Sequence, residues 1–264
     1  MPNAPTNPPG SSRTAFIPGV FGFVAIAALL LPSACRPGQR ALHVAVASNF
    51  ATTLESLVAD FKRETGHAVV VISGSTGKHY AQIVNGAPID IFLAADTLRP
   101  FLLDRDGFAV PGSRRTYAEG RLVLWSAMPG FVDSAGSVLS GDAFDRLSIA
   151  NPELAPYGRA ARQVLEGRGL WEALGERIVR GENVAQAFHF IASGNARLGF
   201  VALSQVLEGA SGSGSYWLVP DDEYDPIEQQ MIVLNETPAA VEFAAYVLRD
   251  DVRARVREAG YVLR

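Results

Sequence analysis

Four segments of the chain place hydroxyl, amide or small residues where a predicted strand gives way to a predicted helix. They are 47–50 (Ala-Ser-Asn-Phe), 73–78 (Ser-Gly-Ser-Thr-Gly-Lys), 151–158 (Asn-Pro-Glu-Leu-Ala-Pro-Tyr-Gly) and 181–185 (Gly-Glu-Asn-Val-Ala). Each can begin a helix with free N–H groups and a side-chain donor, which together suit an anion. Plain N-capping explains any one segment taken alone. The anion-binding interpretation therefore depends on the four segments meeting in space.

The apolar pattern around these segments predicts alternating strands and helices. Residues 41–47 are typical of a strand buried on both faces, and apolar side chains then recur at helical spacing until Gly66, a good helix stop. The alternation continues with strands predicted at 68–72, 89–94, 121–125, 147–150, 177–179, 198–201, 216–219 and 229–234, and with helices after Gly77, Asp96, Gly158 and Asn183 and over 238–259. Such repetition predicts an α/β fold of parallel sheets covered by helices, in which ligands collect at the carboxyl ends of strands.

Composition excludes several classes of protein. The 264 residues are 48% hydrophobic and 19% charged, with a formal net charge of −4. Enough apolar material is present for a core, so we do not expect a disordered chain. Because no basic excess is available to neutralise phosphates, we expect no nucleic-acid partner.

The first 35 residues have the order of a secretory signal peptide. A polar region with Arg13 as its single charge precedes the apolar stretch 15–31, and small residues at 33–34 lead to Cys35. We therefore expect a periplasmic or otherwise exported protein with residues 1–35 as its signal. Cys35 stands where a bacterial lipoprotein is acylated, although Pro32 replaces the Leu expected there. Cleavage nearby without a lipid and a short anchor helix are the alternatives.

The segment 75–78 has to be distinguished from the phosphate-binding loop of nucleotide hydrolases. That loop needs Gly five positions before Gly77, where Ile72 stands, and Ser or Thr after Lys78, where His79 stands. Both requirements fail. We therefore expect Lys78 to be a solvated charge at the rim of a site.

Metal ligands and cofactor motifs are sparse in the sequence. His43, His67 and His189 are expected to be structural or exposed, and the single Cys provides no thiolate cluster. The acidic run 221–225 lacks the spacing of a calcium loop and is typical of a solvated turn. We expect no resident metal ion and no cofactor.

A catalytic alternative is an exported hydrolase. It would use Ser75 as nucleophile beside His79, with Asp90 or Asp96 behind the imidazole. No Gly-x-Ser-x-Gly elbow is present to expose the serine. We therefore predict that the protein is not an enzyme.

Several motifs, taken in order, resemble the periplasmic molybdate-binding proteins of ABC importers. The matching segments are 44–50 (VAVASNF), 74–83 (GSTGKHYAQI), 86–96 (GAPIDIFLAAD), 151–158 (NPELAPYG), 182–184 (ENV) and 198–201 (LGFV). The resemblance implies a two-lobed periplasmic-binding-protein type II fold, in which each lobe is a mostly parallel sheet flanked by helices. By this resemblance, residues 41–118 form the first part of lobe 1, residues 119–220 form lobe 2, and residues 221–264 return to lobe 1.

The same resemblance implies a ligand and the residues that bind it. The ligand would be molybdate or tungstate, delivered by a monomeric receptor to the membrane permease of an ABC importer. The implied oxyanion-binding residues are Ser48, Asn49, Thr76, Tyr157 and Val184. Thr76 takes the place of the family's second-loop Ser. Many members carry a ligand-binding Tyr after the Gly-Phe-Val strand, where this chain has Ala202, whereas one branch uses a Tyr at position 157.

Elementary chemistry supports neutral donors for such a ligand. A tetrahedral dianion offers four acceptor oxygens and no proton, so hydroxyl and N–H groups suit it. Six hydrogen bonds to a charged group give about 9–18 kcal/mol, against about 1–4 kcal/mol from four helix dipoles. Nanomolar binding needs about 12 kcal/mol, so no buried Lys or Arg is required. Hydrogen phosphate carries a proton that needs an acceptor and should bind poorly.

Three alternatives remain open at this point. A receptor for sulfate or a small organic acid would share the fold, because sulfate differs from molybdate mainly in size. The hydrolase with Ser75 and His79 belongs to a different class. A regulator's sensor domain is disfavoured because no helix-turn-helix segment precedes Ala41.

Overall fold

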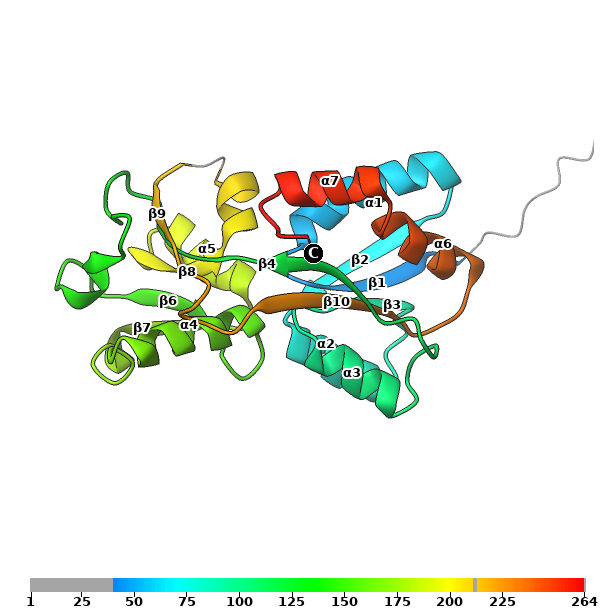
Figure 1. Cartoon of the computed structure of the whole chain (residues 1–264), viewed down its shortest axis with the longest axis horizontal. Coiled ribbons are helices and arrows are strands. Elements are labelled where there is room, and N and C mark those ends of the chain that lie inside the picture. The colour runs from blue at the N-terminus through cyan, green and yellow to red at the C-terminus, as the bar shows by residue number, and fades with distance from the viewer. Residues whose placement is uncertain (1–39, 211–212, 264) are drawn as a thin grey trace, which may run out of the picture. The chain divides into compact units, whose positions relative to one another are not determined.

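Two five-stranded sheets, each covered by helices, organise the chain (Figure 1). This computed structural model describes residues 40–210 and 213–263. The predicted signal peptide and Cys35 lie outside the described residues. Within the described ranges, none of the helices combines the length and apolarity that crossing a bilayer requires.

The first sheet has the strand order β2-β1-β3-β10-β4. Its strands are β1 (Leu42–Ala47), β2 (Val69–Gly74), β3 (Ile91–Leu93), β4 (Arg115–Gly120) and β10 (Ile227–Val233). β1 pairs in parallel with β2 and β3, and β10 runs antiparallel to β3 and β4. Four of the five strands therefore point the same way, as predicted for a mostly parallel sheet.

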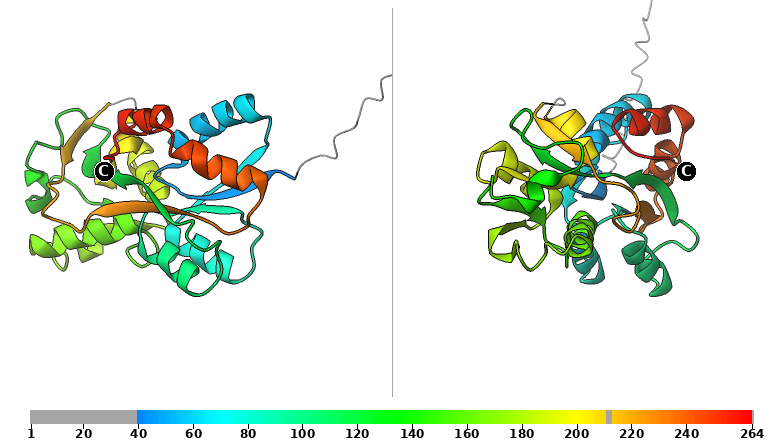
Figure 2. Two further views of the ribbon diagram at one scale, coloured as in Figure 1. Left: turned by 45° about the vertical axis from the view of Figure 1, so that its right-hand side comes forward. Right: turned by 60° about the vertical axis from the view of Figure 1, so that its left-hand side comes forward.

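Helices cover both faces of this sheet (Figures 1 and 2). They are α1 (Ala51–Thr65), α2 (Thr76–Val84), α3 (Leu98–Arg105), α6 (Pro238–Val247) and α7 (Asp250–Glu258). The alternation of side chains along a strand explains the two layers. Val44 and Val46 belong to the apolar cluster of α1, α6 and α7, whereas Ala45 belongs to that of α2 and α3.

The second sheet has the order β7-β6-β8-β5-β9. Its strands are β5 (Leu122–Ser126), β6 (Leu147–Ala150), β7 (Ile178–Gly181), β8 (Leu198–Ala202) and β9 (Ser215–Leu218). α4 (Pro156–Gly167) and α5 (Val184–Ala192) pack on it, as do the 3₁₀-helix η1 (Ser137–Ser140) and the π-helix η3 (Gln205–Gly209). A second 3₁₀-helix, η2 (Gly175–Arg177), directly precedes β7. β5 is the antiparallel member, pairing with β8 and β9. The prediction of mostly parallel sheets flanked by helices is confirmed in both halves.

The chain passes between the two sheets twice. β4 ends at Gly120 and β5 begins at Leu122, so a single residue separates a strand of the first sheet from one of the second. The return runs from the end of β9 to the start of β10. These two crossings lie close together because β4 and β10 are hydrogen-bonded neighbours, with Gly120 paired to Ile227.

Some elements differ from the sequence-based prediction. Strand β4 was not predicted, because its sequence Arg-Thr-Tyr-Ala-Glu-Gly mixes charged residues with only a short buried stretch. Helix α4 begins at Pro156 and not after Gly158, because proline is well accommodated at the first helical position. The helices predicted over 238–259 are found as α6 and α7.

Candidate anion-binding site

A small cavity lies where the ends of β1, β2 and β3 meet the starts of α2, α4 and α5. About 10 Å³ of it is open to the centres of water-sized spheres, which is roughly room for one water molecule. The residues that line it are Ala47, Ser48, Asn49, Gly74, Ser75, Thr76, Ala95, Ala155, Pro156, Tyr157, Asn183 and Val184. The structure thus brings all five predicted site residues to one cavity. None of these described lining residues carries a charged side chain.

Two buried hydroxyls on the first-sheet side are oriented by backbone donors. Ser48 Oγ accepts a hydrogen bond from Ala185 N at 3.3 Å, and Thr76 Oγ1 accepts one from Ala95 N at 3.1 Å. A hydroxyl whose oxygen accepts such a bond keeps its own proton for donation. Both side chains can therefore donate to a guest in the cavity.

The first turn of α2 distributes its N–H groups in a defined way. Gly77 N donates to Leu154 O at 2.9 Å, a contact from the first sheet's helix to the segment before α4. Lys78 N donates to the capping Ser75 Oγ at 3.4 Å. Of the first three N–H groups of α2, that of Thr76 is therefore the one without a hydrogen-bond partner among the described residues.

The first turn of α5 follows the same plan in the second half of the molecule. Ala185 N donates to Ser48 Oγ, and Gln186 N donates to the capping Asn183 Oδ1 at 3.0 Å. This leaves Val184 N, at the first helical position, without a partner in the described part of the chain. Val184 therefore contributes to the cavity through its main chain, whatever its side chain.

Helix α4 contributes through its second residue. Pro156 at the first position has no N–H, while Gly158 N and Arg159 N both donate to Ala155 O, at 3.0 and 3.1 Å. The N–H of Tyr157 is left as the available donor of that turn within the described ranges. Three helices thus each bring one main-chain donor to the cavity walls.

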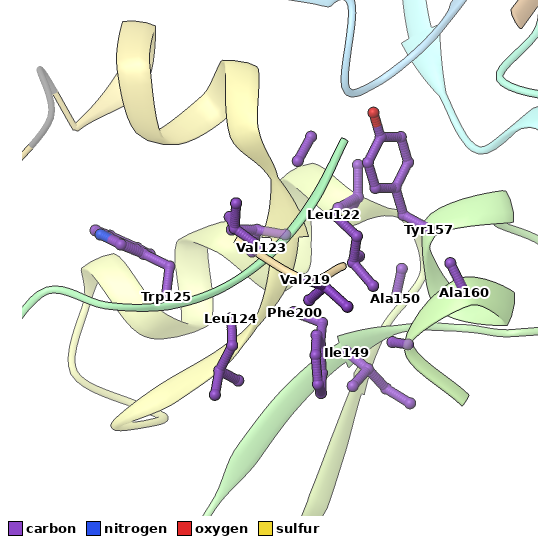
Figure 3. Packing of buried hydrophobic residues seen from close by; sticks show 14 of the residues in the cluster. Leu122, Val123, Leu124, Trp125, Ile149, Ala150, Tyr157, Ala160, Phe200 and Val219 are labelled. Carbon is purple, nitrogen blue, oxygen red and sulfur yellow. The ribbon is translucent and has the colours of Figure 1, made fainter. Parts of the chain in front are cut away.

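The Tyr157 side chain runs from the cavity to the crossing between the sheets. Its ring packs with Leu122 and Ala150 in the second half's apolar cluster, and its hydroxyl points away from that cluster (Figure 3). The hydroxyl accepts a hydrogen bond from Gln229 Nε2 at 3.4 Å. Burial raises the pKa of Tyr157 well above its usual value, so the hydroxyl stays protonated.

Asn49 is buried at 2% exposure and is held by its amide. Nδ2 donates to Gln229 Oε1 at 3.0 Å and to the Tyr261 hydroxyl at 3.2 Å. Its Oδ1 is buried without a hydrogen-bond partner among the described residues. Sequence reasoning missed Gln229. The available signal was the alternation along β10, in which Gln229 shares the buried face with Ile227 and Met231.

The geometry of Ser75 and His79 does not support hydrolysis. Ser75 Oγ caps α2, and both imidazole nitrogens of His79 are engaged, Nε2 with Val46 O at 3.2 Å and Nδ1 with Gln82 Oε1 at 3.0 Å. Desolvation lowers the pKa of His79 and keeps the ring neutral. The serine therefore has no imidazole base positioned to activate it.

Pairs of polar side chains connect the two halves around the cavity. Lys78 Nζ lies 2.7 Å from Glu182 Oε1, and both side chains are about half exposed, as expected for charges at a rim. Thr53 Oγ1 donates to Glu208 Oε2 at 2.8 Å, joining α1 to η3. No cluster of metal-ligating side chains is present among the described residues.

Comparison with known proteins now identifies the family. Residues 42–262 match the family model described as bacterial extracellular solute-binding protein. This chain belongs to that family. As a solute-binding protein it is exported and is not an enzyme, as predicted from the sequence.

Similar proteins are known in sequence and in structure. The molybdate-binding protein ModA of Azotobacter vinelandii is 48% identical to this solute-binding protein over 244 residues, covering 91% of this chain and 96% of that protein. The molybdate-binding protein ModA of Rhodobacter capsulatus is 42% identical over 247 residues, covering 92% and 95%. The solved structure of the A. vinelandii periplasmic molybdate-binding protein superimposes with a TM-score of 0.82, covering 84% of this chain and 99% of that one.

Proposed function

We propose that this solute-binding protein captures molybdate or tungstate between its two halves and delivers it to the membrane permease of an ABC importer. The observation that carries the proposal is the cavity itself. Neutral donors from both halves surround it, and no charged side chain is among its described lining residues. The identity of 48% to a relative named for molybdate binding favours this ligand.

The lobes and the ligand contacts follow from the same proposal. Residues 41–118 and 221–264 form lobe 1, and residues 119–220 form lobe 2. The oxyanion oxygens accept hydrogen bonds from the hydroxyls of Ser48 and Thr76 and from main-chain N–H groups of Thr76, Tyr157 and Val184. Asn49 forms the wall between them.

The donor set favours some tetrahedral ions over others. Each hydrogen bond to a dianion contributes about 1.5–3 kcal/mol, so five or six such bonds reach nanomolar affinity without a fixed positive charge. Hydrogen phosphate carries a proton that needs an acceptor. Because the proposed contacts are all donors, one of these hydrogen bonds would be lost. Discrimination against sulfate depends on the cavity radius.

Calorimetry on the chain starting at residue 36 tests the ligand. We expect molybdate and tungstate to bind more tightly than about 10 μM, and phosphate to bind at least about 100-fold more weakly. A competition titration with sulfate tests the alternative that the protein is a sulfate receptor. Failure of both molybdate and tungstate to bind at about 10 μM would reject the proposal.

The cellular form belongs to the same proposal. The protein acts as a monomer, residues 1–35 direct its export, and a lipid on Cys35 anchors it to the membrane. Mass spectrometry of the membrane fraction, with a Cys35→Ala variant as control, tests the anchor. A wild-type chain recovered only in soluble form and without added mass would contradict the lipid.

A further inference from the structure

A buried chain of neutral hydrogen bonds connects the two lobes behind the cavity. Its centre is Gln229 of β10, which is fully buried. Gln229 Oε1 accepts from Asn49 Nδ2 at 3.0 Å and from the Tyr117 hydroxyl at 2.9 Å, while Nε2 donates to the Tyr157 hydroxyl at 3.4 Å. One side chain thus contacts a residue of the cavity wall from each lobe.

An irregularity in the sheet helps to place these partners. The pairing of β10 with β4 shifts register between Gln229 and Gln230, whose partners are Ala118 and Thr116. Tyr117 is therefore the extra residue of a β-bulge, a feature that re-aims side chains near functional sites. The bulge lies within the strand that leads directly into the first crossing.

Gly120, the last residue of β4, leaves room for the Tyr157 hydroxyl. A Cβ atom at this position would lie 2.0 Å from the Tyr157 oxygen and 2.6 Å from Gln229 Nε2. Only glycine allows so close an approach of backbone to side chain. The crossing strand is thus shaped around the Gln229–Tyr157 contact.

The chemistry of an amide suits this position. A glutamine can accept with one end and donate with the other, whereas a carboxylate only accepts and a lysine only donates. Since the partners are an amide and two protonated hydroxyls, the network is neutral throughout. It adds no charge next to the dianion that we propose as the ligand.

We propose that Gln229 is a positioning residue for ligand binding, which holds Tyr157 of lobe 2 against Asn49 of lobe 1 and so fixes the closed spacing of the donors. Gly120 provides the space for this link. The inference deepens the proposed function and rests on it. Gln229 does not line the cavity, so its effect on affinity passes through Tyr157 and Asn49.

A double-mutant cycle tests the link. Molybdate affinity is measured by calorimetry for the wild type, Gln229→Met, Tyr157→Phe and the double variant. Each single variant is expected to bind about tenfold more weakly, a loss of about 1.4 kcal/mol. The double variant should bind no more than about twofold more weakly than the weaker single variant, because both changes remove the same link.

The neighbouring glutamine provides a matched control. Gln230 lies on the same strand, but its side chain contacts Arg114 and Thr116 on the outer side. Gln230→Met should leave molybdate affinity within about twofold of wild type. Thermal unfolding without ligand distinguishes lost stability from lost affinity, since a purely structural role for Gln229 would lower the unfolding temperature and leave the affinity of the folded protein unchanged.

The outcomes separate the two proposals. Additive losses in the double variant, or an unchanged affinity of Gln229→Met, would overturn the role of Gln229 while molybdate binding by the wild type upholds the function. A wild type that does not bind molybdate or tungstate overturns both. If Gln229→Met does not fold, Gln229→Asn, whose shorter amide cannot span both partners, enters the same cycle with the same criteria.

Discussion

The two lobes furnish the cavity with different kinds of donor. Lobe 1 brings the hydroxyls of Ser48 and Thr76 in addition to the main-chain N–H of Thr76, so residue type matters there. Lobe 2 brings main-chain N–H groups at Tyr157 and Val184, and these donors depend on where α4 and α5 begin, not on the type of side chain. Hydrogen-bond donors can thus depend on the type of side chain in one lobe and on the residue at which a helix begins in the other.

Helices α2 and α5 sharpen the comparison because their first turns are arranged alike. In each, the third N–H goes to the capping residue and the second goes to the opposite lobe, at Leu154 O or Ser48 Oγ. The first N–H of each helix is left for the cavity. The contacts between the lobes therefore use N–H groups next to those that face the cavity, and one helical turn provides both.

The largest expected effect comes from the side-chain donors of lobe 1. Replacing both Ser48 and Thr76 by Ala removes two hydrogen bonds to the dianion, which should weaken molybdate binding roughly 10²- to 10⁴-fold by calorimetry. The exposed pair Thr52 and Ser56 on α1 serves as the control, since Thr52→Ala with Ser56→Ala changes the same residue types away from the cavity. An unchanged affinity of the Ser48 and Thr76 double variant would show that the donors lie elsewhere.

A proline at position 184 tests the main-chain donors of lobe 2. Proline is favoured at the first helical position, and Asn183 before it is already extended, with φ −143° and ψ 174°. Val184→Pro should therefore keep α5 and remove only the N–H, weakening binding roughly 10- to 150-fold. Val184→Ala keeps the N–H and should change affinity less than about threefold, although it loses core packing. Equal losses in the two variants would contradict a main-chain role.

The fourth helical residue is His79 in α2 and Ala187 in α5, which makes the stability of lobe 1 sensitive to pH. Because burial lowers the pKa of His79 from 6.5, the unfolded chain binds this proton more readily. The free energy of unfolding should then fall as pH drops below 6.5 towards the lowered pKa, by at most about 1.4 kcal/mol per pH unit. His79→Gln should flatten this part of the profile in urea titrations from pH 5 to 7.5. A profile as steep as that of the wild type would assign the effect to other groups.

The smallest expected effect belongs to the rim pair of Lys78 and Glu182. Both side chains are about half exposed, so the pair contributes about 0–1 kcal/mol and is screened by salt. Lys78→Met should weaken molybdate binding no more than about fivefold, with the difference from wild type disappearing in 0.5 M salt. A larger or salt-independent loss would indicate that Lys78 contacts the ligand directly.

The sequence allowed prediction of those parts of the molecule that depend on residue type or periodicity. The alternation of strands and helices follows from buried β-branched runs, and the hydroxyls at 48 and 76 stand out at strand ends. Val184 could be assigned only through resemblance, because every residue except proline has an N–H to offer.

The link behind the cavity escaped sequence reasoning for physical reasons. Gln229 stands between two other polar residues of β10, Glu228 and Gln230, and the alternation that places it on the buried face does not indicate its partners. Gly120 ends strand β4, which the charged residues in its sequence kept from being predicted, and the role of Gly120 depends on a side chain that is distant in sequence. Contacts of this kind arise from the pairing of β4 and β10, which no local pattern specifies.

The main-chain donors of α4 and α5 have a consequence for how such receptors can diverge. Substitutions at positions 157 and 184 other than proline preserve the main-chain N–H that faces the cavity, so donation itself does not fix the type of side chain there. In this chain position 157 carries a tyrosine that reaches the crossing strands. A related receptor with another side chain at position 157 would therefore link its lobes differently while keeping the same main-chain donors for the ion.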